Sequence, residues 1–115
     1  MEIVFRCKEP AGSLKEAVQE KLGHLARFLD GLETAEVRFL EDPSRIPAER
    51  EVCEVTLSGH GHHVRARCCG PDHAVALDLV VDKLAHQLTK LKGRLQRRSH
   101  PRHGGQVTAG TSWLW

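Results

Sequence analysis

Cysteine and histidine have the widest chemical repertoire in this chain, because they bind metals and act as nucleophiles. The four cysteines stand at positions 7, 53, 68 and 69, without Cys-x-x-Cys spacing. The segment GHGHH, residues 59–63, gathers three of the histidines, but a hairpin turn accounts for it and no second ligand cluster has zinc-finger spacing. We therefore expect no metal site and no cofactor. Cys7, Cys53 and Cys68 alternate inward and are expected to act as small apolar core residues.

Two carboxylates, Asp78 and Asp82, lie four residues apart and would share one face of a helix. Paired carboxylates can perform general acid and base catalysis, but an acidic start is also what the dipole of a helix favours. The chain has no Gly-rich phosphate loop, no Gly-x-Ser-x-Gly and no His-Glu-x-x-His. We therefore expect that the protein is not an enzyme, and that it has no small-molecule substrate.

Positive charge is concentrated at one end of the chain. Residues 1–82 hold ten Lys and Arg against fifteen Asp and Glu, a net −5, whereas residues 83–115 hold seven bases and no acid, a net +7, which together give +2. The seven bases are Lys83, Lys90, Lys92, Arg94, Arg97, Arg98 and Arg102. Such a set predicts a polyanionic partner. Because aromatic residues make up only 4% of the chain, backbone contacts to folded RNA are favoured over base stacking on single strands.

Apolar periodicity predicts the elements that must position these bases. Alternation predicts strands over residues 2–8, 34–41, 51–59 and 62–70, with a Gly-His-Gly hairpin turn between the last two. Three-and-four spacing predicts a helix that begins with Ser13 and Glu16 as a capping box and continues to Leu29. A second helix, capped by Asp72, extends to residue 98 on the stripe Leu77, Val81, Leu84, Leu88, Leu91 and Leu95. The loop 42–50 is expected to be exposed.

This order, β-α-β-β-β-α, predicts a two-layer α+β fold: a four-stranded sheet with both helices packed on one face. The other face would meet water and display Arg6, Lys8, Arg38, Arg65 and Arg67 among Glu36, Glu54 and Thr56. We expect one domain over residues 1–98 and a flexible tail or linker over 99–115. With no secretory signal and no apolar run of membrane-spanning length, a cytoplasmic location without membrane contact is expected.

The stretch DHAVALDLVVDKLAHQLTKLKGRL resembles the second-helix signature of the ribosome hibernation-promoting factors, also called ribosome-associated inhibitor or sigma-54 modulation proteins. The matching positions are Asp72, Ala76, Asp78, Leu79, Asp82, Lys83, Leu84, Gln87, Leu88, Lys90 and Lys92. Two departures are His73-Ala74, where the signature has Met-Tyr, and a first helix without the usual Thr-Asp start. The strand and helix order of the family agrees over residues 1 to about 98.

The resemblance implies that the protein binds the small ribosomal subunit and its 16S rRNA, in the channel for messenger and transfer RNA. Translation would be inhibited by steric exclusion under stress or in stationary phase. Lys83, Lys90 and Lys92 are the contacts that the resemblance implies. Charge alone adds Arg94, Arg97, Arg98, Arg65 and Arg67. A second ribosome or a separate dimerisation factor is a further partner that this family suggests.

Three alternatives remain open on the sequence. A general double-stranded RNA-binding module would share the architecture, a transcription-associated modulator would bind a sigma factor, and an enzyme or metal-binding protein would use the Cys and His residues.

Overall fold

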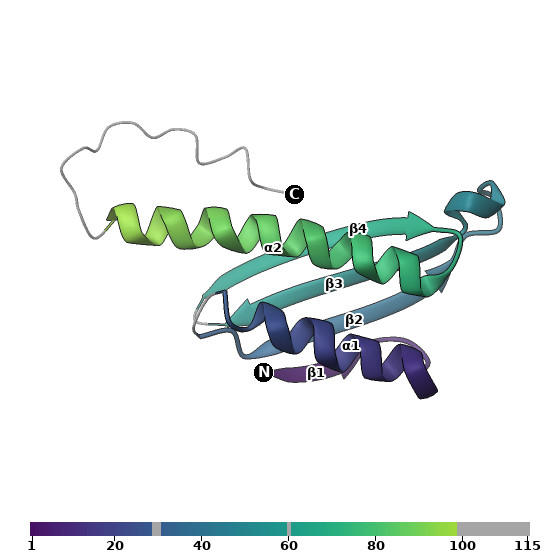
Figure 1. Cartoon of the computed structure of the whole chain (residues 1–115), viewed down its shortest axis with the longest axis horizontal. Helices are drawn as coiled ribbons and strands as arrows, with labels where there is room; N and C mark the ends of the chain where they lie inside the picture. The colour runs from purple at the N-terminus through teal and green to yellow at the C-terminus, as the bar shows by residue number, and fades with distance from the viewer. Residues whose placement is uncertain (29–30, 60, 99–115) are drawn as a thin grey trace.

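Strands and helices follow one another in the computed structural model in the order that the apolar pattern predicts. The structure describes residues 1–28, 31–59 and 61–98, the last three of these by their backbone alone. The elements are β1 (Glu2–Phe5), α1 (Gly12–Leu25), β2 (Thr34–Glu41), the short 3₁₀ helix η1 (Pro47–Glu49), β3 (Glu51–Gly59), β4 (His62–Gly70) and α2 (His73–Arg98) (Figure 1). The predicted α+β class and element order are confirmed.

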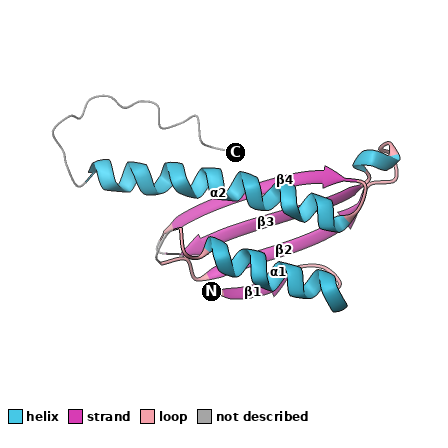
Figure 2. Ribbon diagram, viewed as in Figure 1, coloured by secondary structure: helices cyan, strands magenta, loops and turns pink. Residues whose placement is uncertain are grey.

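The four strands stand in the sheet in their sequence order, β1-β2-β3-β4. β1 and β2 are parallel, because α1 carries the chain back between them, and the two later pairs are antiparallel. Val37, Val55 and Ala66 lie opposite one another on successive strands. Both helices cover the same face of the sheet (Figures 1 and 2). The opposite face, called the open face below, is covered by neither α1 nor α2.

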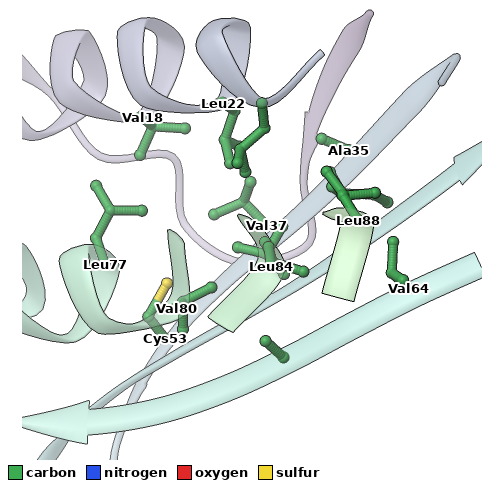
Figure 3. Close-up of a cluster of buried hydrophobic side chains, with 14 of the residues drawn as sticks. Val18, Leu22, Ala35, Val37, Cys53, Val64, Leu77, Val80, Leu84 and Leu88 are labelled. Carbon is green, nitrogen blue, oxygen red and sulfur yellow. The ribbon is translucent and has the colours of Figure 1, made fainter. Parts of the chain in front are cut away.

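The core lies between the helices and the covered face of the sheet, and it is built almost entirely from aliphatic side chains. Figure 3 shows Val18 and Leu22 of α1 and Leu77 and Leu84 of α2 directed toward the strands. The strands contribute the alternating residues predicted from the sequence: Ala35, Val37, Cys53, Val55, Leu57, Val64 and Ala66. In the described part of the chain no polar or charged residue is buried. Burial of this apolar area is therefore the main stabilising contribution to the fold.

The first helix differs from the prediction at both ends. Ala11 is its N-cap residue, no side chain caps it, and Ser13 already lies in its first turn, so the predicted capping box is wrong. Gly12 takes a φ of 63° at the first position of the helix, and the N-cap lies two residues earlier than predicted. The helix ends at Leu25 and residues 26–28 form a turn, so the predicted continuation of the helix toward Leu29 is wrong. Leu29 itself lies outside the described residues.

Two further segments refine the predicted pattern. β1 ends at Phe5 rather than at residue 8, although the Arg6 amide still donates to the Val37 carbonyl over 2.9 Å. The loop 42–50 is exposed as predicted. Its η1 helix contacts β3 and β4, and Val52, which alternation places on the open face, is only 1% exposed. Val52 is therefore shielded from water at that end of the open face, which corrects the prediction for this position.

The second helix begins as predicted, because the Asp72 carboxylate accepts a hydrogen bond of 2.9 Å from the Val75 amide. Its buried residues are Ala76, Leu77, Val80, Leu84, Leu88 and Leu91. Val81 and Leu95, which belong to the predicted stripe, are partly exposed. The C-terminal end of α2 extends beyond the sheet (Figure 1), so its last turns have no strand beneath them. None of the helices in the described ranges is long and apolar enough to span a bilayer.

The turn between β3 and β4 follows the predicted hairpin, with Gly59 paired to His62 and with Gly61 at a φ of 80°. Gly59 is required for a different reason. A Cβ placed there would overlap the Gly31 carbonyl oxygen and come within 2.7 Å of the Glu33 amide nitrogen. The backbone at the end of β3 therefore lies too close to the segment before β2 to leave room for a side chain at this position.

Gly59→Ala is expected to lower the free energy of unfolding by at least about 2 kcal/mol, because backbone must move to admit the methyl group. Gly23→Ala is the matched control, since a Cβ at this position in α1 meets nothing within 4 Å. That change should raise the free energy of unfolding by about 0.5–1 kcal/mol through helix propensity. Urea titrations followed by circular dichroism measure both, and equal effects of the two changes would contradict the close approach at Gly59.

Candidate nucleic-acid interface

The cationic side chains of α2 lie on two different sides of the helix. At about 100° of rotation per residue, Lys83, Lys90 and Arg94 fall within roughly 40° of one another, whereas Lys92 lies about 180° from Lys83. Lys83, Lys90 and Lys92 are exposed, and Arg94 is half-buried. The predicted contacts on α2 are therefore not one continuous set. We call the side that carries Lys83, Lys90 and Arg94 the cationic flank.

Gln87 shows which way the cationic flank faces. It lies on the same side of α2 as Lys83, about 40° away, and its Nε2 donates to the Arg65 carbonyl oxygen over 3.0 Å. Arg65 belongs to β4, the edge strand of the sheet. The cationic flank therefore lies beside β4, at the edge of the sheet from which Arg65 and Arg67 project on the open face.

The opposite side of α2 faces α1. Val81 and Ala85 on this side pack against the core, and Lys21 Nζ of α1 lies 2.7 Å from Asp78 Oδ1. The hydrogen bond that Lys21 donates to Asp78 raises the pKa of Lys21, so this cation is matched by an acidic partner. Lys92 follows the same side, about 20° from Ala85. Asp78 thus forms an ion pair between the two helices. This role differs from both roles considered from the sequence, which were a favourable charge at the start of the helix and one half of a catalytic pair.

The lysines of α2 differ from Lys21 in their surroundings. Among the described residues no carboxylate oxygen lies within 4.0 Å of Lys83, Lys90 or Lys92. Like charges on one flank repel one another, and a polyanion would relieve this repulsion. The cationic flank therefore has the electrostatic character that a phosphate-binding surface requires.

The open face carries its own carboxylates close to its bases. Arg65 Nη2 lies 2.8 Å from Glu54 Oε2, and Arg6 Nε lies 2.9 Å from Glu36 Oε1. Arg67 and Arg38 are exposed on the same face. The predicted mixture of charges is confirmed there, and Arg65 has an internal partner that the sequence pattern did not identify.

The last predicted bases lie at or beyond the limit of the description. Arg97 and Arg98 continue the α2 backbone, and their side chains lie outside the described residues, as do all of Arg102 and the tail 99–115. His60 of the GHGHH segment also lies outside them.

The cysteines are free thiols. Cys53 is fully buried, as predicted, and burial raises its pKa to about 12, so the thiol is protonated at neutral pH and unsuited to nucleophilic chemistry. Cys68 packs against the core from the edge strand. Cys7 is only partly buried, because β1 has already ended, and its Sγ accepts a hydrogen bond of 3.3 Å from the Phe39 amide. In the described ranges no three Cys, His, Asp or Glu residues are grouped to hold a metal ion.

His73 is the first of the two residues, His73-Ala74, that replace Met-Tyr of the second-helix signature. Its Nε2 lies 3.3 Å from the Leu40 carbonyl oxygen and 3.8 Å from Glu51 Oε1. Its ring centroid is 4.9 Å from that of Phe39. The first residue of α2 is thus attached to the adjoining ends of β2 and β3, a contact that sequence periodicity does not reveal.

Comparison with known proteins identifies the family of this chain. The sequence model of the family described as sigma 54 modulation protein / S30EA ribosomal protein matches residues 1–96. The ribosome hibernation promoting factor of Escherichia coli K12 is 29% identical over 85 residues, which cover 74% of this chain and 84% of that protein. The Klebsiella oxytoca protein of the same name is 26% identical over equal shares.

Solved structures share the fold. The N-terminal domain of Thermus thermophilus Protein Y superimposes with a TM-score of 0.58 at 23% identity, over 78% of this chain and 94% of that one. A ribosomal subunit interface protein from Coxiella burnetii gives a TM-score of 0.60 at 20% identity, over 81% and 99%. The resemblance carried by residues 72–92 is thereby confirmed. The chain belongs to the sigma 54 modulation protein / S30EA ribosomal protein family.

Proposed function

We propose that this protein is a ribosome hibernation factor. It binds the small ribosomal subunit in the channel for messenger and transfer RNA and inhibits translation by steric exclusion under stress or in stationary phase. Membership of the family and relatives named ribosome hibernation promoting factors support the activity. The observation that carries the binding mode is the pair of exposed lysines, Lys83 and Lys90, with no carboxylate within 4.0 Å among the described residues.

The binding energy comes from phosphates of 16S rRNA. A helix whose other side is buried against a sheet holds its cations at fixed spacing, so little side-chain freedom beyond that of the lysines is lost on binding. Lys83, Lys90 and Arg94 make the central contacts along the cationic flank. The Arg97 and Arg98 positions extend them toward the end of α2. Lys92 adds a contact from the opposite side of the helix, and Arg65 and Arg67 contribute from the β4 edge. The domain over residues 1–98 is the binding unit.

A sucrose-gradient profile with purified ribosomal subunits tests this function. The protein is expected to migrate with the small subunit at low salt, and to dissociate steeply as salt rises because phosphate contacts release counterions. In a translation extract the same concentrations should reduce synthesis. Migration with a free RNA duplex but not with the subunit would contradict the proposal in favour of a general duplex-binding module. Binding to a sigma factor that survives nuclease treatment would favour a transcription modulator instead.

The same gradient reports a further partner. A peak of paired ribosomes that appears with this protein alone would identify a second ribosome as partner, whereas pairing that needs an added protein would identify a separate dimerisation factor. Single small subunits with bound protein and no paired ribosomes would define a translation block without pairing.

A further inference from the structure

The open face of the sheet differs from the cationic flank in one respect, which is that its bases are interleaved with carboxylates. Four arginines, Arg6, Arg38, Arg65 and Arg67, share this face with Glu36 and Glu54. The Arg6–Glu36 contact, at 2.9 Å, joins the residue that follows β1 to β2, and the Arg65–Glu54 contact, at 2.8 Å, joins β4 to β3. The face therefore keeps a net positive charge, but much of it is already engaged within the protein.

Glu54 is central to this arrangement. In the strand register its Cα lies opposite Arg38 of β2 on one side and opposite Arg67 of β4 on the other, and its carboxylate also contacts Arg65. Only 13% of the Glu54 side chain is exposed, against 55% for Arg65. The carboxylate thus lies against the Arg65 guanidinium, between two strands that carry further arginines, and is itself poorly accessible to a large ligand.

We propose that Glu54 is an internal counter-anion that sets how strongly the open face binds RNA phosphate. The proposal rests on the proposed function, because it assigns the open face as a second, attenuated contact surface beside the cationic flank. A phosphate that approaches Arg65 must share or displace the Glu54 carboxylate, and it meets the negative charge of Glu54 beneath the arginines. Glu36 plays the same role for Arg6.

The sign of the effect follows from what holds the arginines in place. The sheet fixes the backbones of Arg38, Arg65 and Arg67, so the Glu54 carboxylate is not needed to keep these three side chains on one face. Removing its charge frees the Arg65 donors for phosphate and removes a like charge from below the ligand. Both changes strengthen binding to a polyanion. The opposing loss of side-chain order is confined to Arg65, whose side chain is 55% exposed and whose backbone stays in β4.

The test compares Glu54→Gln with Glu16→Gln. Both variants raise the net charge by one, but Glu16 is exposed on α1, which covers the other face of the sheet. The probes are purified small ribosomal subunits and a 20-base-pair RNA duplex, each titrated at several salt concentrations. Glu54→Gln is expected to tighten duplex binding about threefold to tenfold and to steepen the salt dependence by up to about one phosphate contact. Glu16→Gln should change it by less than about twofold, because screening weakens distant charges.

A duplex affinity of Glu54→Gln no higher than that of Glu16→Gln overturns the inference. The Arg65→Gln background supplies an independent reading, because the effect of Glu54→Gln should shrink there if it acts through Arg65, and an unchanged effect overturns the inference as well. Glu36→Gln, judged against Glu16→Gln by the same criterion, replaces Glu54→Gln if circular dichroism shows that variant to be unfolded. Wild-type protein that fails to bind small subunits would contradict the proposed function, while the duplex comparison still decides the role of Glu54.

Discussion

Replacing Lys83 and Lys90 together with glutamate is expected to weaken binding to the small ribosomal subunit by on the order of a hundredfold or more, because two phosphate contacts become repulsive. Both residues are exposed, so the fold should remain intact by circular dichroism. The slope of log affinity against log salt should fall by about one for each lysine. Fluorescence titration of labelled protein with purified subunits at 50–200 mM salt, a range of about fourfold, measures both quantities.

The matched control is Lys83→Glu combined with Lys92→Glu. It makes the same change in net charge on the same helix, but Lys92 lies on the opposite side of the helix from Lys83. A smaller loss of affinity in this variant would support the cationic flank as the central contact surface. Equal losses in the two double variants would show that net charge, and not the position of the flank, controls binding.

Leu84→Ala is expected to lower the free energy of unfolding by about 2–5 kcal/mol, because the change leaves a cavity in a packed core. Leu84 is fully buried between α2 and the strands (Figure 3). A loss of this size is a large part of the roughly 5–15 kcal/mol that stabilises a typical domain. Urea unfolding followed by circular dichroism measures it. Ribosome binding should fall in parallel only at temperatures where the variant is partly unfolded.

Leu79→Ala is the control on the same helix. Leu79 is 43% exposed, so its truncation removes few core contacts and should cost less than about 1 kcal/mol. If the two leucines proved equally sensitive, α2 would not pack with the face that the structure shows.

The strands and the face of the second helix could be predicted because each depends on a short period in the sequence. Ala35 and Val37, or Val64 and Ala66, alternate as a half-covered sheet requires, and all four are buried. The start of the first helix could not be predicted in the same way, because Ser13 satisfies the capping pattern while the helix itself begins at Gly12. The end of a helix depends on a local backbone choice that several sequences permit.

The candidate interface was predicted as a set of bases, but its geometry depends on contacts between elements. The helical period separates Lys92 from Lys83 and Lys90, which counting charges cannot do. The Lys21–Asp78 and Arg65–Glu54 pairs each join side chains from two elements. Periodicity states which face a residue occupies and not which partner it meets there, so the contacts made by Lys21, Glu54 and Gln87 were not predicted.

The hydrogen bond from Gln87 to the Arg65 carbonyl has a consequence for how the protein behaves at high concentration. β4 pairs with β3 on one side and forms an edge of the sheet on the other, and such edges invite pairing with a strand of another molecule unless something blocks them. Gln87 occupies one carbonyl, and Arg65 and Arg67 act as gatekeepers by repelling an identical copy. The positive charges that suit RNA thus also oppose self-association, and neutralising them exposes the protein to aggregation.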